Sequence, residues 1–131
     1  MKYIFMFFLT ISLFGYPVLK HKIDEIALNN LKKESNFFQI YKIDDNIKML
    51  FLDLKIEGET FEKKSNTFLE KYGNLLNLKD INKLKIKNII SLKTRTVVKY
   101  AHFENNTEVL NSEIIIIFDK NEKISQITNS F

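Results

Sequence analysis

The sequence predicts an α+β domain in which one main amphipathic helix packs on an antiparallel β-sheet. Two observations support this fold class. Residues 61–72 carry apolar side chains at helical spacing, and six other segments are rich in strand-forming residues and separated by turn residues. Two of the predicted strands precede the helix and four follow it. The four that follow are expected to form a meander.

Residues 61–72 are the most clearly predicted element. One face of the helix carries its stripe, which consists of Phe61, Ser65, Phe68, Leu69 and Tyr72. Thr60 is placed to cap the first turn. Glu62 lies near the positive start of the helix and Lys71 near its negative end, and both signs favour the helix dipole. Gly73 is expected to adopt the left-handed conformation that ends a helix.

Residues 37–43 and 48–56 are predicted as the two strands before the helix. Asp44, Asp45 and Asn46 between them have turn chemistry. In the second strand, aliphatic residues alternate with other residue types and so form one face: Leu50, Leu52, Leu54 and Ile56. This alternation predicts a half-buried strand.

The four strands after the helix are predicted at residues 85–92, 95–103, 112–118 and 123–129, with turns at 93–94, 104–107 and 119–122. The strand at 112–118 is apolar on both faces. Ile114, Ile116 and Phe118 share one face, and Ile115 and Ile117 share the other. We therefore expect this strand to be central, or to be covered by the helix on one side and by another element on the other.

The N-terminal residues resemble an export signal. Lys2 is followed by an apolar stretch, residues 3–15, that is shorter than the roughly 20 residues of a membrane-spanning helix. We interpret residues 1–19 as a signal peptide or N-terminal anchor, residues 20–36 as a leader or short helix, and residues 37–131 as the domain. The protein is therefore expected to be exported, periplasmic or secreted, and to contact a membrane only if the N-terminal segment is retained.

Composition narrows the functional classes further. The chain has no cysteine, so disulfides and a lipoprotein anchor are excluded, and the domain must be held by its core alone. The formal net charge of +4 is spread along the chain, which argues against a nucleic-acid partner. The densest basic region is interpreted as a solvated side of the sheet, with an acidic partner as the alternative: Lys83, Lys85, Lys87, Lys93, Arg95 and Lys99.

No set of residues predicts catalysis. His102 and Glu104 lie two apart on a predicted strand and so share a face, but two ligands are too few for a closed zinc site. Carboxylate pairs at residues 44–45 and at Glu57 and Glu59 are explained by turns. We therefore predict a protein that is not an enzyme and has no cofactor, metal or small-molecule substrate.

Three segments together resemble the FTP domain, the fungalysin/thermolysin propeptide motif. They are FLEKYGNLLNLKDINKLKI at 68–86, RTVVKY at 95–100 and SEIIIIFDKNEKI at 112–124. The family has a helix ending in a Phe-Leu pair, a leucine-rich connection, an Arg-Thr strand and a last strand with Glu before its aliphatic run. The resemblance covers roughly residues 37–131 and implies a helix on a sheet, as in propeptides and cystatins.

The sequence departs from this family between the Arg-Thr strand and the isoleucine strand. The family carries glutamines and then a Gly-x-Pro-Val turn there, whereas this chain has Ala101-His102 and, further on, residues 106–109. Asparagines stand where the family has glycines, and Asn is the residue that next best tolerates positive φ. The fold is expected to survive these changes, but the contacts of the glutamines and the proline are not carried over.

The resemblance implies a partner rather than a reaction. Such propeptides help a thermolysin-like zinc metallopeptidase to fold and hold it inactive. This chain has no His-Glu-x-x-His motif, so we expect it to bind such a peptidase in trans. The expected contacts lie on the exposed sheet and the 104–109 loop: Tyr100, His102, Phe103, Glu104, Asn106 and Glu108. Two alternatives stay open, a periplasmic or surface protein-binding module without the peptidase link and a truncated remnant of a peptidase precursor gene.

Overall fold

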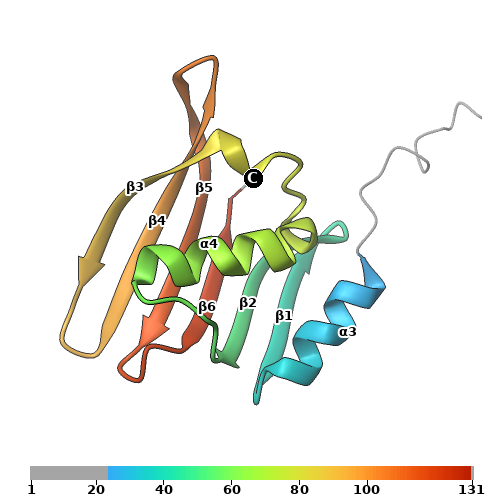
Figure 1. Cartoon of the computed structure of the whole chain (residues 1–131). Helices are drawn as coiled ribbons and strands as arrows, with labels where there is room; N and C mark the ends of the chain where they lie inside the picture. Colours follow the sequence, from blue (N-terminus) through green and yellow to red (C-terminus); the bar gives the residue numbers. More distant parts are fainter. Residues whose placement is uncertain (1–23, 131) are drawn as a thin grey trace, which may run out of the picture.

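A computed structural model describes residues 24–130 (Figure 1). The predicted signal peptide or anchor at residues 1–19 lies outside the described residues. The elements follow one another as α3 (Glu25–Glu34), β1 (Phe38–Ile43), β2 (Asn46–Leu54), α4 (Phe61–Tyr72), the 3₁₀ turns η1 (Gly73–Leu76) and η2 (Ile81–Lys83), β3 (Leu84–Ser91), β4 (Arg95–Glu104), β5 (Thr107–Asp119) and β6 (Ile124–Asn129).

The strands form one six-stranded antiparallel sheet with the order β1-β2-β6-β5-β4-β3. The α+β prediction is therefore confirmed. The four C-terminal strands form the expected meander, and the β1–β2 hairpin joins it where β2 pairs with β6. The isoleucine strand β5 is central, as predicted, because it pairs with β4 on one side and with β6 on the other.

Helix α4 lies across one face of this sheet (Figure 1). Thr60 caps it as predicted, since the Thr60 side chain accepts a hydrogen bond of 3.1 Å from the Lys63 amide. The predicted stripe faces the sheet, and its residues Ser65, Phe68, Leu69 and Tyr72 are buried. Phe61 contacts Phe118 of β5 edge to face, with ring centroids 5.0 Å apart. These contacts fix α4 over the centre of the sheet.

The helix does not end at Gly73 in the way the sequence predicted. Gly73 has φ −57°, a right-handed conformation, and the chain continues into η1. Asn77 instead takes the left-handed conformation, with φ 62°, and its amide donates to the carbonyl of Asn74. The prediction failed because Leu75 and Leu76 are fully buried, and burying them requires another helical turn.

Helix α3 is part of the packed unit rather than a separate leader. Leu31 is fully buried and belongs to the same hydrophobic core as α4 and the sheet. The Asp24 side chain caps the helix by accepting from the amides of Ile26 and Ala27 at 3.1 Å. At the other end, Glu34 accepts hydrogen bonds from the Tyr72 hydroxyl and from Lys71, which join α3 to α4.

The core lies between the helices and the sheet. The predicted aliphatic face of β2 is buried, which confirms that prediction, and β5 contributes Ile114, Ile116 and Phe118. The polar side chain of Asn129 is also buried there. Its amide nitrogen donates to the carbonyl of Ile47 at 3.0 Å and to that of Leu76 at 3.1 Å, so it joins β6, β2 and η1. Because its amide nitrogen donates to two backbone carbonyls, this Asn can lie inside the core.

Asp and Asn side chains occupy the tight turns. Asp44 and Asp45 have φ 52° and 64°, and Asn105 and Asn106 have φ 50° and 67°, which are the conformations of two-residue hairpin turns. The β4–β5 turn is therefore only two residues long. The predicted loop at 104–109 is wrong in this respect, because β5 begins at Thr107 and includes residues that were assigned to the loop.

Within residues 24–130, neither helix has the length and apolar character that crossing a bilayer requires.

Candidate functional site

The β4–β5 hairpin carries most of the predicted contact residues and extends past the rest of the sheet (Figure 1). We call residues 102–109 the hairpin arm. Its pairs are His102 with Val109, Phe103 with Glu108, and Glu104 with Thr107. The neighbouring strand β3 reaches the arm only at its base, where Leu84 pairs with His102. Asn106 lies at the tip. Residues 104–107 of the arm are exposed, whereas the rest of the arm is half-buried.

His102 and Glu104 come together at the base of the arm. The His102 Nε2 atom lies 2.9 Å from a Glu104 carboxylate oxygen, and the Lys83 ammonium donates to the other oxygen at 2.9 Å. The hydrogen bond from Lys83 holds the pKa of Glu104 below its ordinary value. These groups line a pocket of about 210 Å³ together with residues 77–80. Glu104 is thus already neutralised within the domain.

Glu108 and Phe103 are also engaged by lysines. The Lys87 ammonium lies 3.0 Å from a Glu108 carboxylate oxygen and 3.7 Å from Glu113. The Lys85 ammonium lies 5.0 Å from the centre of the Phe103 ring, within the range of a cation–π contact. Lysines of the basic region on β3 therefore pair with the arm rather than forming an isolated cationic patch.

Tyr100 does not belong to the exposed surface. Its side chain faces α4, and only 3% of its surface is accessible. The hydroxyl donates to the Asn66 Oδ1 atom of α4 at 2.5 Å. Burial raises the pKa of this hydroxyl. The expectation that Tyr100 contacts a partner from an exposed strand is wrong, because strand alternation places it on the covered face with Val98.

Among residues 24–130, no group of three or more His, Asp or Glu side chains is placed to hold a metal ion. His102 and Glu104 form a pair, and the Lys83 ammonium, 2.9 Å from a Glu104 carboxylate oxygen, repels a cation.

The face of the sheet opposite α4 is another candidate surface. In the part of the chain that is described, no helix or loop covers it (Figure 1). Cross-strand partners share a face, so Phe51, Gln126, Ile117, Val97 and Ile90 form one row across five strands.

A second row runs beside the first and contains Met49, Thr128, Ile115, Lys99 and Asn88. We call these two rows the open face. Most of its apolar side chains are half-buried, and Ile90 is 43% exposed. Lys99 makes no ion pair with any residue in the described range. The open face therefore combines six apolar side chains with three polar ones and with Lys99, a cation that is unpaired among the described residues.

The sequence analysis predicted that Ile115 and Ile117 face away from Ile114 and Ile116, and the structure confirms this. An exposed side of the sheet was expected, but the residues that form the open face were not predicted, because strand pairing across the sheet determines which residues become neighbours. The β2–β6 pair brings Phe51 beside Gln126 although they are far apart in the sequence.

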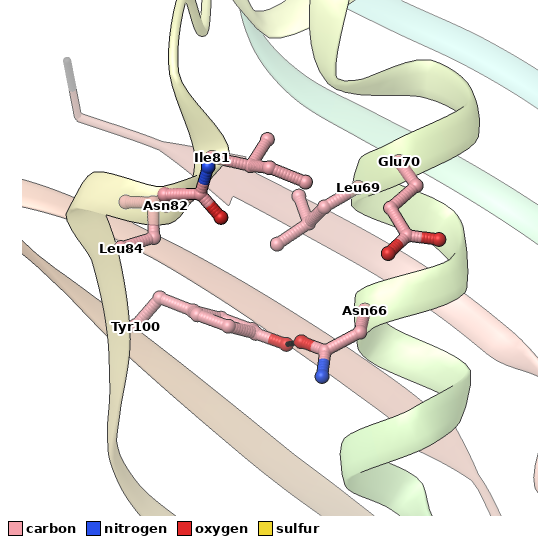
Figure 2. A pocket seen from close by; sticks show the side chains of 7 residues that line it. All are labelled: Asn66, Leu69, Glu70, Ile81, Asn82, Leu84 and Tyr100. Carbon is pink, nitrogen blue, oxygen red and sulfur yellow. Dashed lines mark hydrogen bonds between the residues drawn. The ribbon is translucent and has the colours of Figure 1, made fainter.

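A second pocket lies on the helix side of the sheet. Figure 2 shows the side chains that line it: Asn66, Leu69 and Glu70 from α4, Ile81, Asn82 and Leu84 from η2 and the start of β3, and Tyr100 from β4. Its volume is about 240 Å³. We call it the α4–η2 pocket. No sequence motif marks it, because three separate segments supply its lining.

The fold and these surfaces define an α+β domain with one covered and one open face of its antiparallel sheet. Comparisons with known proteins add no family: no family model matches the chain, and neither a curated protein nor a solved structure matches it.

Proposed function

We propose that this protein is a non-enzymatic, exported binding domain that docks on a thermolysin-like zinc metallopeptidase and inhibits it, or assists its folding, in trans. The sequence resemblance to the FTP domain supplies the partner class. The α+β fold is compatible with this resemblance. The observation that carries the binding role is the open face, because a sheet face with contiguous, partly accessible apolar side chains and no helix over it is typical of an interaction site.

The open face also specifies the chemistry of the partner surface. Its two rows supply preformed strands, whose rigidity lowers the entropy cost of association. Apolar side chains at Phe51, Ile115 and Ile117 require an apolar counterpart. Lys99 lies beside Ile115 on the neighbouring strand β4 and favours a carboxylate opposite its ammonium. The peptidase would therefore offer an apolar patch that contains one acidic side chain.

Inhibition is tested by titrating a thermolysin-like peptidase from the same genome with the purified protein and following peptide hydrolysis. We expect saturable inhibition, or faster recovery of activity when the denatured peptidase refolds in its presence. Ile117→Lys should abolish either effect, because an ammonium would be buried in an apolar contact. Ile26→Lys is the matched control, since Ile26 is 75% exposed on α3 and far from the open face.

Two results would contradict the proposal in different ways. If neither activity nor refolding changes and no complex forms, the link to the peptidase is wrong. A periplasmic or surface module that binds another protein through the same face then becomes the better interpretation. If inhibition persists in Ile117→Lys, the peptidase partner stands but the open face is not the contact.

A further inference from the structure

The α4–η2 pocket has an apolar floor. Leu69, Leu84 and Tyr100 are buried, and Ile81 packs against the same core. Side chains from α4 approach from one side and those from η2 and β3 from the other, with the Tyr100 ring beneath them (Figure 2). A floor of this kind favours the aliphatic part of a ligand, because apolar groups are removed from water on both sides.

The rim of the pocket carries a carboxylate that the domain leaves without a counter-ion. Glu70 makes no ion pair and no side-chain hydrogen bond with any residue between 24 and 130. The neighbours at helical spacing are Asn66 one turn before it and Asn74 one turn after it, so no cation of α4 reaches it by the usual i±4 pairing. The pocket beside His102 is different, because there Lys83 already neutralises Glu104.

Two amides complete the rim. Asn66 is held in place by the Tyr100 hydroxyl, which donates to its Oδ1 atom at 2.5 Å. The Asn82 side chain faces it from η2 (Figure 2). Glu62 lies one helical turn before Asn66, and its charge acts on Tyr100 in the same direction as burial, which raises the pKa of that hydroxyl. The rim is therefore polar and anionic in a protein whose net charge is positive.

We propose that the α4–η2 pocket binds the basic side chain, Lys or Arg, of a partner protein. The alkyl stem would lie on Leu69, Leu84 and Tyr100, and the charged head would reach Glu70 and the two amides. Long basic side chains combine these two properties, whereas an anion would meet Glu70 and a purely apolar group would leave Glu70 uncompensated. This proposal does not rest on the proposed function, because the pocket and the open face lie on opposite sides of the sheet.

The probe for this proposal is Nα-acetyl-lysine N-methylamide, titrated into the ¹⁵N-labelled full-length protein while amide chemical shifts are recorded. We expect saturable shifts confined to residues 66–70, residues 81–84 and Tyr100, with a dissociation constant in the millimolar range for a single side chain. Nα-acetyl-norleucine N-methylamide has the same stem without the charge and should bind more weakly by about fivefold, the upper range for a partly exposed ion pair. The corresponding arginine derivative should shift the same amides.

n-Butylamine tests whether the free amine suffices. If it binds as well as the capped lysine, the site accepts small amines in general, and the proposal of a protein side chain is overturned.

Glu70→Gln should reduce lysine binding to the norleucine level. Glu59→Gln removes the same charge from an exposed loop position and should leave binding unchanged. The proposal is overturned if both probes bind equally, if the shifts lie elsewhere, if no shift saturates, or if Glu70→Gln binds like the parent protein. Each of these outcomes leaves the docking test on the open face unaffected.

Discussion

The two faces of the sheet are built from the same strands, but their side chains differ in burial. On β5, Ile114, Ile116 and Phe118 lie under α4 and are completely buried. Ile115 and Ile117, their immediate neighbours, lie on the open face and remain partly accessible. The same residue type therefore serves as core at one position and as surface at the next.

The hydrophobicity of a strand residue is therefore not enough to assign its side chain to the core. A run of four isoleucines has no hydrophobic periodicity. The packing of the helices therefore determines which face of the strand is buried. Both helices of the described chain supply their apolar stripes to one face, and none is left for the other. The predictions below test whether the contrast is energetic as well as geometric.

The largest effect is expected from truncating one isoleucine on each face. Ile116→Ala should lower the free energy of unfolding by about 2–5 kcal/mol, because it opens a cavity in a fully packed core. Ile117→Ala is the matched control and should cost only about 1 kcal/mol, since the side chain is already partly in water. Urea unfolding followed by circular dichroism measures both values.

Equal losses for the two variants would mean that the open face is covered in solution, by another copy or by residues outside the described range. If Ile116→Ala does not fold, Ile116→Val replaces it, with an expected cost of about 0.5–1.5 kcal/mol.

A smaller loss of stability is expected from a substitution in the connection that leads into helix α4. Gly58 precedes α4 with φ 145°, and a Cβ atom there would lie 2.7 Å from the Lys64 backbone nitrogen. Gly58→Ala should therefore push the first turn of α4 away from the sheet and cost about 1–3 kcal/mol. Thermal unfolding measures the loss. Gly73→Ala is the control, because Gly73 has ordinary helical φ and its nearest side-chain atoms would be 3.6 Å from the new Cβ. A Gly58→Ala variant as stable as the control would contradict this account of the connection.

The smallest effect concerns the contact between the two covering helices. The Tyr72 hydroxyl and Lys71 donate hydrogen bonds to Glu34, which holds the pKa of Glu34 below its ordinary value of 4.5. A depressed pKa means that the contact stabilises the fold above pH 4.5 and that this contribution disappears as the pH falls through the folded-state pKa. Because the Glu34 side chain is 42% exposed, the contribution should be at most about 1 kcal/mol.

Glu34→Gln should lower the free energy of unfolding at neutral pH. It should also reduce the loss of stability that occurs as the pH falls through the pKa of Glu34. Urea unfolding at several pH values measures both effects. Glu104→Gln is a useful comparison, since the pKa of Glu104 is also lowered but its partner is Lys83 at the hairpin arm. If the Glu34→Gln protein loses as much stability at acidic pH as the parent protein, the α3–α4 contact does not contribute to the pH dependence.

Most of the fold could be predicted from local signals. The stripe from Phe61 to Tyr72, the alternation in β2 and the Asp-Asp and Asn-Asn turns depend on residues close in sequence, and the structure contains each of them. The last residue of α4 was predicted correctly, but the right-handed conformation of Gly73 was not, because the burial of Leu75 and Leu76 beyond it is a tertiary effect. For the same reason the sequence left open whether residues 20–36 form a leader or a short helix, and the burial of Leu31 shows that the helix belongs to the packed domain.

The candidate surfaces were predictable only in part. His102 and Glu104 could be paired because they are two residues apart on one strand. Tyr100 was assigned to the wrong side because its face depends on where the helix packs. The α4–η2 pocket combines segments around residues 66–70, 81–84 and 100, and only folding brings these together.

The hairpin arm has a consequence for local stability. Residues 103–108 pair only with each other, so their backbone hydrogen bonds can open without disturbing the sheet. Amide protons there should exchange with solvent long before those of Ile114 and Ile116, whose strand has neighbours on both sides. The arm is thus a part of the sheet that can change shape at low cost, while Lys83 and Lys87 restrain it through their contacts with Glu104 and Glu108.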